Sequence, residues 1–104
     1  MNEIDNLAQL IRNFADKRDW GKFHTPKNLA MAITGEAGEL ASEFQWLSNE
    51  EVTRLSKQDL DSIRLEIADV GIYLIRLCDV LDINLSEAIK EKVSLNEKRF
   101  PEVK

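Results

Sequence analysis

Residues 67 to 81, with the sequence IADVGIYLIRLCDVL, constrain the fold more than any other part of the chain. A helix through this segment carries apolar side chains on nearly all of its sides. Such a helix has to be buried on more than one side. In a protein of 104 residues, either the centre of a helical bundle or a contact between subunits provides that burial.

The remaining chain also shows helical periodicity, because its apolar residues recur three and four positions apart. We expect helices at residues 3 to 19, 26 to 48, 56 to 81 and 84 to 99. A short polar connection at residues 49 to 55 separates the second helix from the third. This order of elements, with short links between helices, is typical of an all-α protein.

Capping residues support these boundaries. Thr25 and Pro26 form an N-cap and a first helical residue, because proline lacks only an N–H group that would be unpaired there. Ser56 and Asn84 mark the starts of the third and fourth helices. The chain contains 4 glycines and 2 prolines, too few for a turn-rich β protein. We therefore predict a single domain over residues 1–104, folded as an all-α four-helix bundle.

Charge and composition exclude several classes of partner. The net charge of -5 argues against binding to DNA or RNA. No apolar run approaches the roughly 20 residues of a membrane helix, and the polar, acidic start of the chain does not resemble a signal peptide. The one cysteine, Cys78, fits a reducing compartment. We expect a soluble cytoplasmic protein.

Two segments, TGEAGELASEFQW and RLEIADVGIYLIR, place acidic residues along one face of a helix. The first stripe holds Glu36, Glu39, Glu43 and Trp46. The second stripe holds Glu66, Asp69, Tyr73 and Arg76. Like charges at this spacing repel one another, so the pattern indicates either a solvated acidic face or a cation site. The apolar neighbours of Asp69 favour the site, and an all-oxygen ligand set suits Mg²⁺, Mn²⁺ or Ca²⁺ rather than zinc.

These motifs resemble those of the MazG-like all-α nucleoside triphosphate pyrophosphohydrolases. The family signature is E-E-x-x-E, a spacer and then E-x-x-D; the chain has GEAGE followed by EIAD. Within the family the likeness is to the dCTP pyrophosphatase branch. It is carried by RDWGKFHTPKNLAMAITGEAGELASEFQW, EIADVGIYL and EKVSLNEKRFP, and extends over roughly residues 14 to 101. Gly35 replaces the leading glutamate, as in that branch, which leaves the number of metal ions open.

The resemblance implies hydrolysis of a nucleoside triphosphate to the monophosphate and pyrophosphate, with Mg²⁺ as cofactor and Mn²⁺ as a substitute. The residues that match the family's metal ligands are Glu36, Glu39, Glu66 and Asp69. One carboxylate has to accept a proton from the attacking water, and we expect Glu36 or Glu39 in this catalytic role. The implied substrate is dCTP or a modified pyrimidine nucleotide, and the implied role is house-cleaning of the nucleotide pool.

Further residues are candidates for binding the substrate. Lys92 and Asn96 share one face of the last predicted helix, and the resemblance implies that they contact phosphate together with Tyr73. By the same resemblance, Trp20, His24 and Trp46 line a nucleoside pocket. Aromatic rings stack on bases, and Asn28 lies near His24 in the sequence as a further polar contact.

The resembled enzymes are tetramers built from pairs of dimers, with active sites where subunits meet. We therefore expect a homotetramer, with a dimer as the alternative, because the apolar third helix needs more cover than one chain offers. Two other functions remain open. The chain is either a non-catalytic helical interaction module or a related pyrophosphohydrolase that acts on dUTP or phosphoribosyl-ATP.

Overall fold

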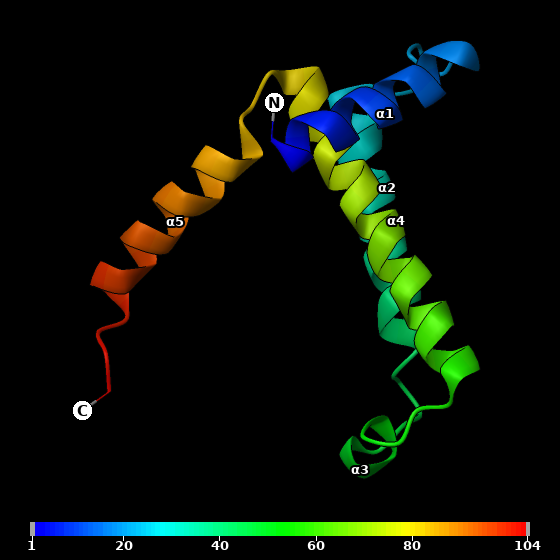
Figure 1. Cartoon of the computed structure of the whole chain (residues 1–104), viewed down its shortest axis with the longest axis vertical. Coiled ribbons are helices and arrows are strands. Elements are labelled where there is room, and N and C mark those ends of the chain that lie inside the picture. The colour runs from blue at the N-terminus through cyan, green and yellow to red at the C-terminus, as the bar shows by residue number, and fades with distance from the viewer. Residues whose placement is uncertain (1, 104) are drawn as a thin grey trace.

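The computed structural model describes residues 2–103, and this range contains helices but no strands. The elements are α1 (Glu3–Lys17), α2 (Pro26–Ser42), α3 (Asn49–Val52), α4 (Lys57–Leu81) and α5 (Leu85–Arg99) (Figure 1). The predicted all-α fold is confirmed. No helix in the described range combines the length and the apolar character that crossing a membrane requires.

The predicted helix starts are confirmed by their capping hydrogen bonds. Thr25 accepts from the Asn28 backbone N–H at 3.2 Å, and Ser56 accepts from that of Asp59 at 3.1 Å. Asn84 caps α5 in the same way. Such caps each contribute about 1 kcal/mol because they satisfy N–H groups that the helix leaves unpaired.

α1 ends two residues earlier than predicted, because Asp19 takes a left-handed conformation with φ of 54°. The backbone N–H of Trp20 then donates to the carbonyl of Ala15 at 3.0 Å, and that of Asp19 donates to Asp16 at 3.1 Å. These two bonds form a Schellman motif, which closes a helix C-terminus. The motif turns the chain back, so that the backbone of Trp20 lies beside the last turn of α1, where it bonds to Ala15.

We predict that Asp19→Gly stabilises the protein by about 0.5–1 kcal/mol, because glycine adopts positive φ without steric cost. The substitution also removes a negative charge from a helix C-terminus, where the helix dipole disfavours it. Thermal unfolding at fixed protein concentration measures the effect. Asp16→Gly is the matched control: it places glycine inside α1 and should destabilise by about 1 kcal/mol. Equal shifts in the two variants would contradict the prediction.

α2 ends at Ser42, so the prediction that it continues to residue 48 is wrong. The Ser42 hydroxyl donates to the carbonyl of Glu39, and the N–H groups of Glu43 and Phe44 bond three residues back rather than four. Side-chain competition of this kind tightens and terminates a helix. Trp46 consequently lies in a turn and does not extend the stripe of acids on α2.

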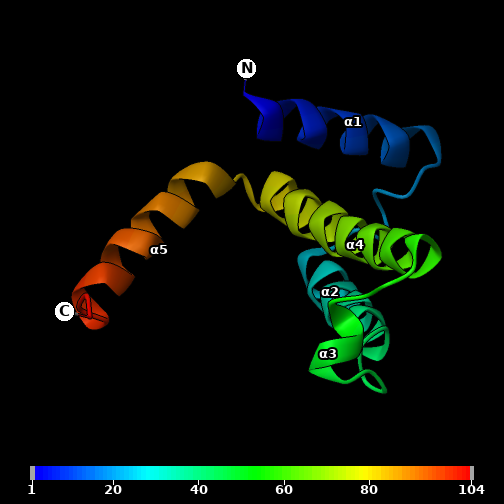
Figure 2. The same cartoon turned by 60° about the horizontal axis from the view of Figure 1, so that its bottom comes forward.

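α4 is the central element, and α1 and α2 pack against different sides of it (Figure 2). Among the described residues, the buried side chains are Ala15, Leu29, Ile63 and Arg76. α5 extends away from the other helices (Figures 1 and 2). One chain therefore packs three of its four long helices together, and the fourth, α5, does not join this bundle within the chain.

The single chain leaves much apolar surface exposed. On α4, Ile67 is 55% and Leu81 is 47% exposed. A compact protein of 11.9 kDa should expose about 6,000 Å², whereas this chain exposes 8377 Å². The radius of gyration, 16.7 Å, likewise exceeds the roughly 13 Å of a compact chain of this length. The helix predicted to need cover on several sides is covered only in part by its own chain.

Candidate functional site

Three of the four carboxylates predicted to hold a metal come together where α2 packs on α4. Glu36 of α2 and Glu66 and Asp69 of α4 each offer one oxygen, and these oxygens lie within 4.8 Å of one another. The spacing of Glu66 and Asp69 places both on the side of α4 that faces α2. Glu39 lies outside this group of three, yet it is near enough for its charge to act on Glu66.

Glu66 is the most constrained of the three. Its Oε2 atom is buried and has no hydrogen-bond partner among the described residues. Burial raises the pKa of Glu66 above its ordinary value, and the charges of Glu36 and Asp69 raise it further. A buried carboxylate oxygen without a donor is costly unless a proton or a cation neutralises it. The donor set therefore fits a hard divalent cation.

A pocket of about 240 Å³ adjoins these acids. Five of the predicted site residues line it, together with residues of α1 and α4. The lining consists of Ile11, Phe14, Ala15, Trp20, His24, Glu36, Asp69, Ile72, Tyr73 and Arg76. A larger cavity of about 340 Å³ lies between α1 and the C-terminal end of α4, but it contains none of the predicted site residues. The smaller pocket is the candidate site because aromatic and acidic groups meet there.

The turn between α1 and α2 builds the aromatic wall of the pocket. Trp20 meets Phe14 edge to face with ring centroids 5.5 Å apart, and it meets His24 at 6.1 Å. The backbone N–H of His24 donates to the carbonyl of Trp20 at 3.1 Å, which holds the turn closed. Trp20 and His24 are therefore positioned by local backbone bonds before α2 begins at Pro26.

Four of the residues predicted to bind substrate do not line this pocket within one chain. Trp46 is 86% exposed, and Asn28 donates its side-chain amide to the carbonyl of Phe23 at 3.0 Å. Lys92 and Asn96 lie on α5, which projects away from the acids (Figure 1). Each of these four residues could contact a ligand in the pocket only if a second chain brought it there or if its own chain changed conformation.

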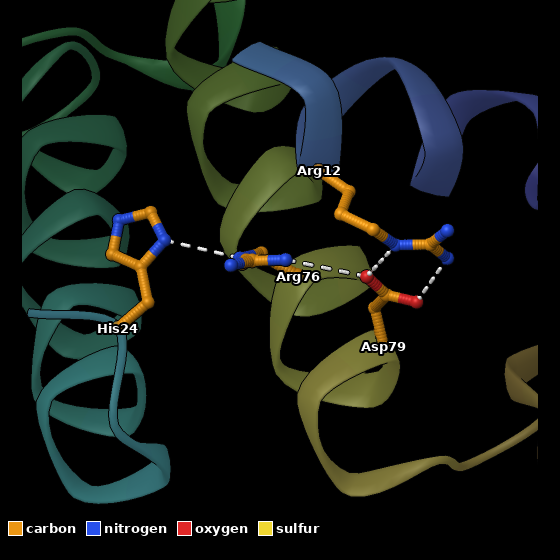
Figure 3. A network of polar contacts seen from close by, with 4 residues as sticks. All are labelled: Arg12, His24, Arg76 and Asp79. Carbon is orange, nitrogen blue, oxygen red and sulfur yellow. Dashed lines mark hydrogen bonds and ion pairs between the residues drawn. The ribbon is translucent and has the colours of Figure 1, made fainter. Parts of the chain in front are cut away.

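A polar network beside the pocket links His24 to Arg12, Arg76 and Asp79, and the sequence predicted no role for the last three (Figure 3). Arg76 is only 6% exposed. Its Nε donates to His24 Nδ1 at 3.0 Å, and its guanidinium also donates to Asp79 at 3.3 Å. Arg12 of α1 binds the same Asp79 carboxylate through two hydrogen bonds of 2.9 and 2.7 Å. The available signal was a charged pair, Arg76 and Asp79, inside the apolar segment 67 to 81.

We predict that Asp79→Asn lowers the free energy of unfolding by about 1–2 kcal/mol at neutral pH, because hydrogen bonds to charged groups contribute about this much. The value is kept at this level because Arg12 is half exposed and water screens its charge. The side-chain hydrogen bond from Arg12 lowers the pKa of Asp79. A carboxyl group whose pKa is lowered by folding stabilises the folded state at pH values above its ordinary pKa of about 3.9. This stabilisation is lost as the pH falls through the lowered pKa.

Denaturant titrations of both proteins at several pH values and one protein concentration measure this difference. It should be full at pH 7 and should shrink below about pH 4. Asp61→Asn, a change to an exposed acid on the same helix, is the matched control. A difference that persists undiminished at the lowest pH would contradict the ionic role of Asp79.

Comparison with known proteins shows the family to which the chain is related. The model of the MazG-like family matches residues 31–104. The chain is 36% identical over 100 residues to dCTP pyrophosphatase 1 of Bos taurus and 38% identical to that of Rattus norvegicus. Each match covers 94% of this chain but only 59% of the relative.

A solved structure, of a pyrophosphatase from Archaeoglobus fulgidus, resembles the whole chain. It is 43% identical with a TM-score of 0.91, and the match covers 98% of this chain and 95% of that one. The family match, the shared fold and the acid motif together show that this chain belongs to the MazG-like family.

Proposed function

We propose that the protein hydrolyses nucleoside triphosphates to the monophosphate and pyrophosphate, using a divalent cation. The observation that carries this proposal is the convergence of Glu36, Glu66 and Asp69 beside a pocket walled by Trp20 and His24. The names of the relatives, dCTP pyrophosphatase 1 and a pyrophosphatase, support it. The proposed substrates are dCTP or modified pyrimidine nucleotides, and the proposed role is house-cleaning in the cytoplasm.

Glu36, Glu66 and Asp69 would hold Mg²⁺, or Mn²⁺ in its place, with Glu39 as a further ligand. When bound, the cation supplies positive charge that neutralises phosphate oxygens and polarises the phosphoryl group. Without it, four carboxylates would repel a triphosphate. The buried, unpaired oxygen of Glu66 gives the cation a ligand that has no competing donor in the described part of the chain.

The chain's own groups then perform the remaining tasks. Glu36 or Glu39 accepts the proton of the water that attacks the α-phosphorus, and pyrophosphate leaves. Tyr73 lines the pocket beside Asp69 and offers its hydroxyl to a phosphate oxygen. Trp20 offers an aromatic face on which a base stacks.

We propose that a neighbouring chain completes the site in a homotetramer. The exposed apolar residues of α4 need cover, and the projecting α5 is available to provide it for another copy. Lys92 and Asn96 would then approach the phosphates from the neighbouring subunit. The ammonium group of Lys92 would offset negative charge, and the amide of Asn96 would donate a hydrogen bond. Light scattering should give a particle of about four chains, and an active monomer of 11.9 kDa would contradict this assembly.

A nucleotide panel assayed for pyrophosphate release tests the function. The panel contains dCTP, 5-methyl-dCTP, dUTP, dTTP, ATP and phosphoribosyl-ATP, each with Mg²⁺, with Mn²⁺ and with excess EDTA. We expect turnover of cytidine nucleotides with either cation and loss of activity in EDTA. Full activity in EDTA, or no pyrophosphate release from any member, would overturn the proposal. Preference for dUTP or phosphoribosyl-ATP would keep the reaction but overturn the proposed substrate.

A further inference from the structure

The contact between Arg76 and His24 determines which ring nitrogen of the histidine can carry a proton. The guanidinium of arginine has five N–H donors and no acceptor. Arg76 Nε lies 3.0 Å from His24 Nδ1, so this nitrogen has to accept the hydrogen bond. A ring nitrogen that accepts is unprotonated, and the proton of a neutral imidazole then resides on the other nitrogen, Nε2.

Arg76 is itself held in place from its other side. Asp79 accepts a hydrogen bond from Arg76, and the two bonds from Arg12 fix the position of the Asp79 carboxylate. Because Arg76 is almost fully buried, it cannot exchange its partners for water without cost. The orientation of the donor that faces His24 is thus determined by a residue of α1 and a residue of α4.

The surroundings of His24 also disfavour its charged form. Burial lowers the pKa of His24, and the charge of Arg76 lowers it further. The imidazole therefore stays neutral over a wider pH range than a free histidine. The Nε2 atom lies on the side of the ring away from Arg76 (Figure 3) and has no hydrogen-bond partner among the described residues.

We infer that Arg12, Asp79 and Arg76 act as positioning residues that hold His24 in its Nε2–H tautomer, so that the pocket offers a hydrogen-bond donor to the ligand. The part of this inference that concerns the ligand rests on the proposed function, in which this pocket binds a nucleotide. The matching chemistry is a base with an acceptor on its edge, such as the carbonyl oxygen or unprotonated ring nitrogen of cytosine. A base edge with only donors would meet the Nε2–H group unfavourably.

The tautomer is measured directly by ¹⁵N NMR of protein labelled at histidine. The chain contains one histidine, so tag-free protein gives the two ring nitrogens of His24 alone. We expect an unprotonated Nδ1 and a protonated Nε2, in the absence of nucleotide and metal. A protonated Nδ1 in the wild-type protein would overturn the inference, whether or not the protein hydrolyses nucleotides.

Substitution of Arg76 tests the cause. Arg76→Met keeps an unbranched side chain of about the length of the arginine stem but removes the guanidinium donor, and we expect a mixture of both tautomers. Arg76→Lys restores a donor and a charge, and it should return the signals toward the wild-type pattern. Arg64→Met is the matched control, because Arg64 is an exposed arginine on the same helix. Unchanged histidine signals in folded Arg76→Met protein would show that Arg76 does not select the tautomer.

Kinetics then test the consequence for the ligand. Arg76→Met should raise KM for dCTP about three- to tenfold, the value of one neutral hydrogen bond, with a smaller change in kcat. Arg76→Lys should recover most of the loss, and Arg64→Met should leave KM unchanged. A changed tautomer with unchanged KM would overturn the role in ligand selection. Absence of hydrolysis in the wild-type protein would overturn the proposed function but not the measured tautomer.

Discussion

Asp69→Asn is expected to lower the rate of pyrophosphate release by at least about 10²–10³-fold, the loss seen when one group that stabilises developing charge is removed. The asparagine keeps the shape of the side chain but removes one of the three convergent charges. Fewer charges weaken cation binding, and an amide oxygen is a poorer ligand for Mg²⁺ than a carboxylate. Initial rates over a range of Mg²⁺ concentrations measure the loss, and circular dichroism should show unchanged helix content.

Asp61→Asn is the matched control for this variant. Asp61 lies on the same helix, outside the group of three acids, and its ion pair in the described part of the chain is with the exposed Arg64, at 3.4 Å. Its rate should stay within about twofold of the wild type, because exposed ion pairs contribute little. Comparable losses in the two variants would indicate a general effect of charge on α4, and the metal site would lose its support.

Two inactive variants are expected to restore each other's activity when they assemble together. Lys92→Ala should lose phosphate contacts, and Asp69→Asn should lose the cation. If α5 of one chain serves the acids of another, mixed oligomers contain some sites with both residues intact. With random pairing in a symmetric assembly, about a quarter of the sites are intact, whereas each variant alone has none. Co-expression of differently tagged chains, followed by sequential affinity purification, isolates the mixed oligomers.

The control for this experiment places both substitutions in one chain. Mixing the double variant with Asp69→Asn leaves no intact site, and activity should stay absent. Lys98→Ala, a change to another lysine of α5, should remain active by itself. Mixed oligomers that form but show no recovery would contradict completion of the site by a neighbouring chain, without affecting the tautomer of His24.

The local features of the fold could be predicted because they depend on neighbours in the sequence. Thr25, Ser56 and Asn84 cap helices through bonds to residues three positions ahead. The end of α2 was missed because Ser42 competes for a backbone carbonyl, an outcome that the apolar pattern does not encode. The left-handed Asp19 was missed for a similar reason, since glycine is the usual residue there.

The part of the candidate site that depends on the spacing of residues along one helix could be predicted from the sequence. Glu66 and Asp69 meet Glu36 because acids three positions apart share a helix face and α2 packs on α4. The network around Asp79 depends on how α1 crosses α4, because its partner Arg12 lies 67 positions away in the sequence. Periodicity also indicates which face of α5 is apolar but not what covers it. For this reason the sequence could not place Lys92 and Asn96.

The small core of the single chain couples folding to concentration. With few buried side chains, an isolated copy gains little free energy on folding. If partners cover α4, association provides the missing stabilisation, and mass action then makes the melting temperature rise with protein concentration. Dilution would remove structure and catalysis in a single step. Newly synthesised chains would remain exposed to proteases until enough copies accumulate to protect one another.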